Sequence, residues 1–174
     1  MRWGRPGSRR ESIHPAMLSV HSIDHREAAV AGQIHALLQQ AHAQEAAWLG
    51  RQGPSVLPPS VEQIRSGNAF YLGAFDGDRV VGATGLAPDD EPGQIGIALL
   101  CVTPTHQRQG IGRSLVAEAL RRSGSMVLCV SAAADNAAAL SLYRGLGFVA
   151  YRHGSLGPDR LAIVKLRRAA GGGE

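Results

Sequence analysis

The chain has 174 residues, of which 44% are hydrophobic, and this is enough for one domain with its own apolar core. Its formal net charge is +4, from 18 Lys and Arg residues against 14 Asp and Glu residues. Four of the arginines lie within residues 1–10, so basic and acidic residues balance over the rest of the chain. A neutral body argues against a nucleic-acid-binding protein, and we expect no nucleic acid partner.

Lysine and cysteine usage narrows the class of protein further. Lys165 is the single lysine and follows no glycine-rich loop, which excludes a Walker-type phosphate loop. Cys101 and Cys129 both lie inside apolar runs, as is typical of reduced thiols in a protein core. No apolar run approaches the roughly 18 residues of a membrane span, and the N-terminal sequence lacks the apolar segment of a secretory signal. We therefore expect a cytoplasmic protein with no membrane partner and no metal site.

The ends of the chain differ in character from its body. Residues 1–16 are rich in Gly, Pro, Ser and Arg without periodicity, and a strand pattern begins only at Met17. We expect a disordered tail over 1–16, a single folded domain over 17–168 and a flexible tail over 169–174. The abrupt change motivates the hypothesis that Met17 is the natural start of the protein.

Two helices are predicted after the first strand. Asp24 stands three residues before Glu27, the spacing of a capping box, and the Ala-rich run that follows predicts a helix reaching Trp48. Ser60 and Gln63 repeat that spacing at the start of a short second helix.

Alternating strands and helices fill the rest of the chain. The Asp-Gly step in "DGD", residues 76–78, predicts a hairpin between two strands. The run 95–102 is apolar on both faces, as in a central strand covered on both sides. Further on, the patterns predict a helix from 111, a strand from 126, a helix over 136–146 and two final strands around 148–152 and 160–166. The order β-α-α-β-β-β-α-β-α-β-β predicts an α/β domain with a mixed sheet and helices on its faces.

The turn "QRQGIG" between the central strand and the next helix favours a phosphate-bearing ligand. A helix N-terminus offers free backbone amides and the positive end of the helix dipole. Gly110 and Gly112 remove side chains that would keep a diphosphate away from the backbone. The surrounding side chains add donors without any carboxylate: Gln107, Arg108, Gln109 and Arg113. The turn therefore indicates pyrophosphate binding.

A second motif, "NAAALSLYRGLGF", follows one strand later. Together with "LLCVTPTHQRQGIG" it closely resembles the GNAT superfamily of N-acetyltransferases. The first motif is matched by Gln107, Gly110 and Gly112, and the second by Asn136, Tyr143, Gly147 and Phe148. The resemblance covers roughly residues 17–167 and implies a GNAT-like fold, in which a mixed, mostly antiparallel sheet of about seven strands is flanked by about four helices.

The resemblance also implies acetyl-CoA as co-substrate and an amine as acceptor. In this family the diphosphate lies on the helix-start amides, here from Arg108 to Arg113, and the pantetheine arm runs along the fourth strand. Asn136 would contact the arm from the opposite side. The cofactor-binding residues expected on this basis are Leu100, Cys101, Val102, Gln107, Arg108, Gln109, Gly110, Ile111, Gly112, Arg113, Asn136 and Tyr143.

Acetyl transfer to an amine needs a proton for the departing thiolate, stabilisation of the oxyanion and a base for the amine. The resemblance places Tyr143 as the general acid and the amide of Val102, or a neighbour, at the oxyanion. The base stays open, because Gln94 stands where many relatives have Glu and an amide accepts no proton at neutral pH. The alternatives are the acidic loop residues Asp89, Asp90 and Glu91, and Glu45 on the first helix.

The function expected is therefore acetyl transfer from acetyl-CoA to a primary amine by direct attack, with a small-molecule amine ranked first. One alternative is acetylation of protein N-termini of the ribosomal-protein type. Another is an acyl-CoA sensor that has lost catalysis, which the Gln94 departure suggests. A nucleic-acid binder acting through the Arg-rich tail ranks last. A homodimer is left open.

Overall fold

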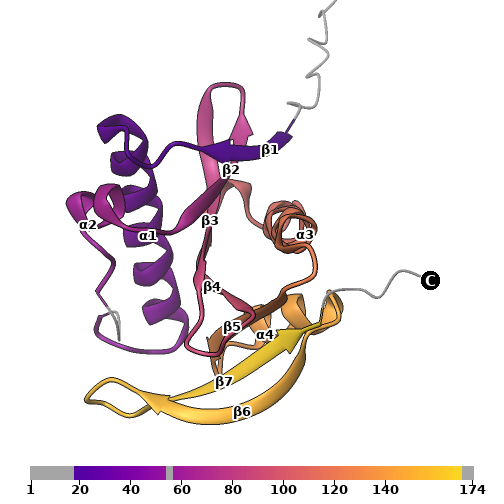
Figure 1. Cartoon of the computed structure of the whole chain (residues 1–174). Coiled ribbons are helices and arrows are strands. Elements are labelled where there is room, and N and C mark those ends of the chain that lie inside the picture. The colour runs from indigo at the N-terminus through magenta and orange to yellow at the C-terminus, as the bar shows by residue number, and fades with distance from the viewer. Residues whose placement is uncertain (1–17, 54–56, 170–174) are drawn as a thin grey trace, which may run out of the picture.

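The computed structural model describes residues 18–53 and 57–169 (Figure 1). Met17 and the expected tails lie outside the described residues, except Ala169. The elements follow the predicted order, with one short 3-10 helix added: β1 (Leu18–Ile23), α1 (Ala28–Trp48), α2 (Val61–Ser66), β2 (Phe70–Asp76), β3 (Arg79–Pro88), β4 (Gln94–Val102), η1 (Pro104–His106), α3 (Ile111–Ser123), β5 (Val127–Ala133), α4 (Ala137–Gly145), β6 (Val149–Leu156) and β7 (Leu161–Arg168).

The seven strands form one mixed sheet in the order β1-β2-β3-β4-β5-β7-β6. Every neighbouring pair is antiparallel except β4 and β5, which run parallel. The crossover between these two strands passes through α3. This confirms the predicted fold class of a mixed, mostly antiparallel sheet with helices on its faces.

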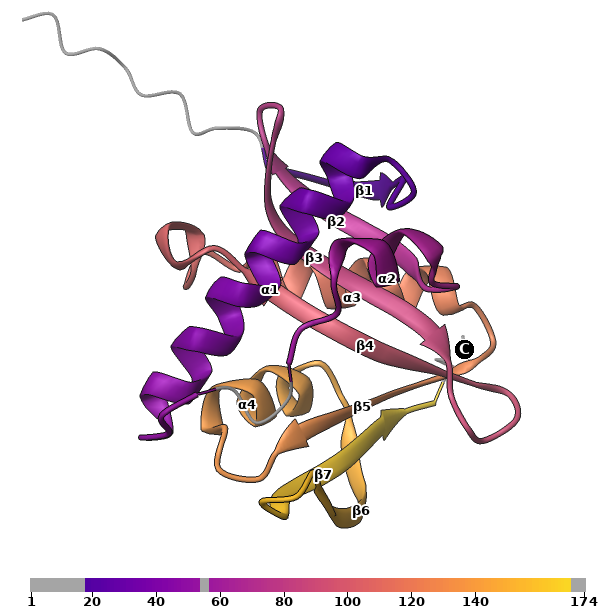
Figure 2. The same cartoon turned by 90° about the vertical axis from the view of Figure 1, so that its left-hand side faces the viewer.

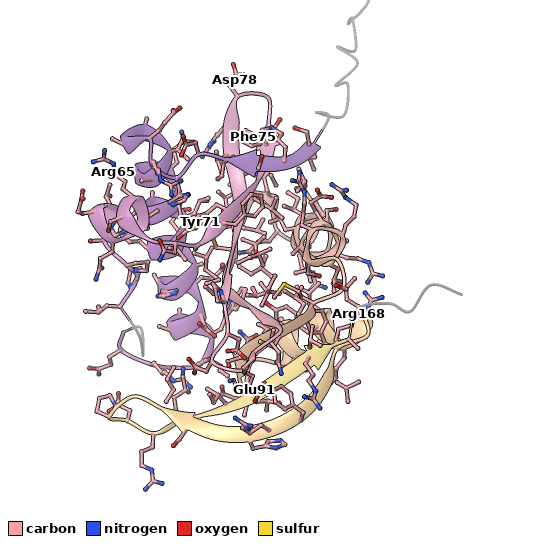
Figure 3. All side chains as sticks on the ribbon, in the orientation of Figure 1. Arg65, Tyr71, Phe75, Asp78, Glu91 and Arg168 are labelled. Carbon is pink, nitrogen blue, oxygen red and sulfur yellow. The ribbon has the colours of Figure 1, made fainter. Side chains whose placement is uncertain are left out.

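Helices cover both faces of the sheet. α1 crosses one face, with α2 beside it, and α3 and α4 lie on the other (Figures 1 and 2). The core under α3 and α4 is the larger one and includes Leu72, Val81, Leu115, Val116, Leu128 and Leu166. The core under α1 includes Ala31, Ile34, Leu38, Ile64, Tyr71 and Cys101. Figure 3 shows Tyr71 on this α1 side.

Of the two predicted capping boxes, one is confirmed and one is wrong. Ser60 caps α2, because its side chain accepts from the backbone N–H of Gln63 and the Gln63 side chain accepts from the backbone of Ser60. At α1 the cap residue is Glu27, and no side chain caps the helix. Asp24 instead accepts from the backbone N–H of Arg26 at 3.0 Å, a local turn that competes with capping.

Glycines set the two turns that the sequence predicts. Gly77 has φ 60° and, with Asp78, closes the β2–β3 hairpin. Gly147 has φ 86° just beyond the end of α4, where a left-handed residue stops a helix and lets β6 begin. The first turn occurs where the "DGD" step predicts it, and the second agrees with the predicted end of the helix at 146.

Candidate active site

The site begins where β4 and β5 separate. The two strands pair only from Gln94 to Ile97 on β4, opposite Val127 to Val130 on β5. Beyond Ile97 each strand continues without the other, and Figure 2 shows them diverging with α4 near their free ends. The separation leaves one edge of β4 open along its second half.

The open edge of β4 presents backbone groups to this gap. Thr103 donates to the Val81 carbonyl at 2.8 Å, so Val102 and Leu100, which alternate with it, turn their amides away from β3. Ala98 is the extra residue of a bulge opposite Gly85 and Leu86, at the point where the gap opens. An extended ligand can therefore pair with Leu100 and Val102 as an additional strand would.

The turn that leads into α3 ends in a left-handed glycine. Gly110 is the N-cap of α3 with φ 80°, a conformation that glycine adopts without strain. Among residues 18–53 and 57–169 no side chain caps this helix, so its first amides lack the usual protein partner there. A Cβ on Gly110 would meet no heavy atom within 4 Å, so the space beside the turn is open. This arrangement fits a diphosphate.

Two side-chain pairs hold the turn in place. Gln107 donates to the Val102 carbonyl at 3.1 Å and exchanges hydrogen bonds with Gln44 of α1, at 2.6 and 3.0 Å. His106 contacts Asp76 of β2 through Nε2 at 2.9 Å. Gln107 therefore connects the turn to both β4 and α1.

The second motif supplies the other wall of the gap. The Asn136 side chain caps α4 by accepting from Ala139 at 3.1 Å, and it donates to Glu45 Oε1 at 2.9 Å. Tyr143 lies seven residues after Asn136, on α4. It is 4% exposed and packs edge-to-face against Phe148. Burial raises the pKa of the Tyr143 hydroxyl, so it stays protonated at neutral pH.

One cleft joins these groups. Its volume is about 1260 Å³, and it extends from the α3 turn, past Tyr143, to α1 and the β6–β7 hairpin. Of the predicted cofactor-binding residues, the cleft is lined by Leu100, Cys101, Val102, Gln107, Arg108, Gly110, Ile111, Gly112, Arg113, Asn136 and Tyr143. Gln109 does not line it; its side chain donates to the Thr105 carbonyl at 3.4 Å.

The candidate bases are distributed unequally around the cleft. Glu45 and Asp89 are the acidic side chains lining it among residues 18–53 and 57–169. Asp90 is exposed outside it, and Glu91 pairs with Arg152 at 3.0 Å beside the β6–β7 hairpin (Figure 3). Gln94 is buried and donates to Glu91 at 2.6 Å, without lining the cleft.

Two features of the cleft were not anticipated from the sequence. Cys129 Sγ donates to Asp89 Oδ2 at 3.2 Å, although the residues lie far apart in the chain. In addition, three exposed apolar side chains rim the cleft, which we call the apolar rim: Trp48 (63% exposed), Leu57 (80%) and Leu156 (47%). These side chains come from the end of α1, the α1–α2 connection and the β6–β7 hairpin. Only the tertiary structure brings these three segments together.

Other site types find no support in the part of the chain described. No cluster of three or more His, Cys, Asp or Glu side chains there is arranged to hold a metal ion. His35 contacts the Pro59 carbonyl at 2.8 Å and belongs to no such cluster. None of the described helices combines the length and apolarity needed to cross a membrane.

Residues 34–148 match the model of the Acetyltransferase (GNAT) family. The chain belongs to the GNAT acetyltransferase family. It is 34% identical over 118 residues to RimI of Mycobacterium tuberculosis, an N-alpha-acetyltransferase, an alignment that covers 64% of this chain and 75% of the relative. As a GNAT member the chain is an acetyltransferase, and acetyl-CoA is its acetyl donor.

Solved GNAT structures share the fold. The ribosomal-protein-S18-alanine N-acetyltransferase from Escherichia coli superposes with a TM-score of 0.70 at 20% identity, over 91% of this chain and 97% of that one. A protein from Salmonella typhimurium described as an acetyltransferase, solved with its cofactor acetyl-CoA, gives a TM-score of 0.68 at 16% identity, over 90% and 96%. The sequence-based assignment to this family is confirmed.

Proposed function

We propose that this GNAT acetyltransferase transfers the acetyl group of acetyl-CoA directly to a primary amine. The observation that carries the proposal is that one cleft connects the uncapped start of α3 to the Tyr143 hydroxyl. A diphosphate held by the first and a thioester near the second would span that cleft. Direct attack then needs no acyl-enzyme intermediate.

Three parts of the cleft have separate roles in this proposal. The amides from Arg108 to Arg113 hold the diphosphate, and the open edge of β4 holds the arm through Leu100 and Val102. Tyr143 donates its proton to the thiolate as the carbon–sulfur bond breaks. Asn136 contributes by shaping α4, since its side-chain oxygen and amide are already bonded to Ala139 and Glu45.

The cysteines are not assigned as acyl carriers. Burial raises the pKa of Cys101 to about 12, and its thiol donates to the Ala83 carbonyl at 3.7 Å. A thiol of that pKa is almost entirely protonated at neutral pH and is a poor nucleophile.

The acceptor that we place first is the α-amino group of a polypeptide, ahead of the small amine that the sequence alone favoured. Two observations support this order. The similarity to RimI, an N-alpha-acetyltransferase, points to a peptide N-terminus. The apolar rim of Trp48, Leu57 and Leu156 offers a wide contact for side chains that follow the reacting residue.

A direct comparison of acceptors tests this proposal. Purified protein and acetyl-CoA are incubated with a peptide that begins with alanine, with the same peptide blocked at its α-amine, and with a pool of small amines. Free CoA and acetylated products are measured. We expect turnover on the unblocked peptide and a higher KM for that peptide in Trp48→Ala. Turnover confined to the amine pool would overturn the peptide assignment.

The same experiment separates catalysis from sensing. Gln94 suggested a sensor, but its side chain lies outside the cleft and bonds to Glu91, so it leaves the cleft chemistry unaffected. Tight acetyl-CoA binding with no product from any acceptor would overturn the proposed function.

A further inference from the structure

The structure distinguishes Asp89, Asp90 and Glu91 of the β3–β4 loop. The sequence alone does not decide which of these three is the general base. Asp90 is exposed and does not line the cleft, and Glu91 is paired with Gln94 and Arg152. Asp89 lines the cleft, and its side chain is 14% exposed. It is thus accessible from the cleft while largely shielded from bulk water.

Asp89 lies close to the point at which β4 and β5 separate. Its backbone N–H donates to the Gln94 carbonyl at 3.2 Å, which continues the β3–β4 ladder to the start of β4. Its side chain reaches Cys129, which pairs with Gly96 one residue before the last β4–β5 pair. Asp89 therefore lies at the narrow end of the gap, whereas Glu45 lies beside Asn136.

The Cys129 thiol orients the Asp89 carboxylate. Sγ donates to Asp89 Oδ2 at 3.2 Å, and the Lys165 ammonium lies 3.9 Å from Oδ1. Burial first, and then the Asp89 carboxylate, raises the pKa of Cys129 to about 12, so the thiol keeps its proton and remains a donor.

We infer that Asp89 is the general base for the acceptor amine and that Cys129 is the residue that positions it. The inference rests on the proposed acetyl transfer. Glu45 is the weaker candidate, because it lies at the contact between α1 and Asn136 rather than where β4 and β5 separate.

The proton balance of the reaction is complete with these groups. Asp89 takes one proton from the acceptor ammonium and passes it to solvent. The nitrogen lone pair forms the new bond to the acetyl carbon, and the carbon–sulfur bond breaks with its electron pair on sulfur. Tyr143 gives its proton to that sulfur, and the second proton lost by nitrogen restores Tyr143.

The test compares Asp89→Asn with Asp90→Asn, its exposed neighbour, using the alanine peptide and the amine pool as acceptors. We expect Asp89→Asn to lower kcat by about 10²-fold or more while its acetyl-CoA Kd stays within about twofold of wild type. Asp90→Asn should match wild type. Calorimetric acetyl-CoA binding by Asp89→Asn shows that the variant is folded. Equal kcat in the two variants would overturn the inference, as would an equal fractional loss of kcat and of acetyl-CoA affinity in Asp89→Asn.

The positioning role of Cys129 has its own comparison. Cys129→Ala removes the donor and should lower kcat by about fivefold with an unchanged KM for acetyl-CoA, whereas Cys129→Ser keeps a donor and should restore most of the rate. Equal rates in these two variants would remove Cys129 from the inference. If wild type binds acetyl-CoA but acetylates no acceptor, the proposed function is wrong and the inference is wrong with it. If wild type is active and Asp89→Asn is equally active, only the inference is overturned.

Discussion

Asn136 Nδ2 donates to Glu45 Oε1 over 2.9 Å and so ties the start of α4 to the last turns of α1 across the cleft. The same side chain accepts from the Ala139 backbone at 3.1 Å. One residue of the second motif therefore caps a helix and joins two walls of the site. The motif asparagine therefore has a structural role at this site.

Two substitutions of Asn136 distinguish the effects of its hydrogen bonds to Ala139 and to Glu45. Asn136→Ala loses the cap and should lower the free energy of unfolding by about 1 kcal/mol. Asn136→Ser retains a capping oxygen but loses the amide donor to Glu45, so it should recover most of that stability. Urea unfolding of the three proteins measures the difference, and equal stability of Asn136→Ala and wild type would contradict the capping role.

Gly110 is expected to be required for acetyl-CoA binding. Gly110→Ala places a Cβ on a residue with φ 80°, which costs about 1–2 kcal/mol, and adds it to a residue that lines the cleft at the proposed diphosphate site. Gly124→Ala is the control at the other end of α3, where φ 59° and ψ −121° strain an alanine at least as much and the surroundings are also open. Both variants should melt at lower temperature, but only Gly110→Ala should weaken acetyl-CoA binding by calorimetry. Equal affinities in the two variants would argue against the diphosphate assignment.

Tyr143→Phe should lower kcat by about 10²-fold with little change in acetyl-CoA Kd, because only thiolate protonation is lost. Burial raises the pKa of Tyr143, so loss of its proton should not reduce the wild-type rate below about pH 10. Tyr151→Phe is the control, since the Tyr151 hydroxyl is buried, has no hydrogen-bond partner in the described part of the chain and does not line the cleft. Stopped-flow or steady-state rates check this, and a fully active Tyr143→Phe would remove Tyr143 from the chemistry.

The His106–Asp76 contact should affect acetyl-CoA binding rather than chemistry. Asp76→Ala frees η1, the first part of the α3 turn, from the β2–β3 hairpin. A partly exposed pair contributes about 0.2–1 kcal/mol, so KM for acetyl-CoA should rise by about two- to fivefold at constant kcat. Asp78→Ala, at the exposed tip of the same hairpin (Figure 3), should leave both constants unchanged. A fall in kcat for Asp76→Ala would indicate a different role.

The predictions that succeeded from the sequence rest on local chemistry. Hydrogen bonds between residues three apart set the Ser60 cap, and a two-residue turn needs Gly77 where the "DGD" step puts it. The Asp24 prediction failed although its spacing was right, because Asp24 bonded to the nearer Arg26 amide instead. Spacing alone could not decide between two local partners of similar geometry.

By itself the sequence determined the order of elements, the family and the glycine turn, because each depends on residues within about one helix or strand of one another. Only the tertiary structure decided which of the candidate carboxylates line the cleft, namely Glu45 and Asp89. Asp89 contacts Cys129, 40 positions further along the chain, and Trp48, Leu57 and Leu156 share one rim. Strand pairing and the β4–β5 gap bring these segments together, and no local sequence pattern predicts such contacts between residues far apart in the chain.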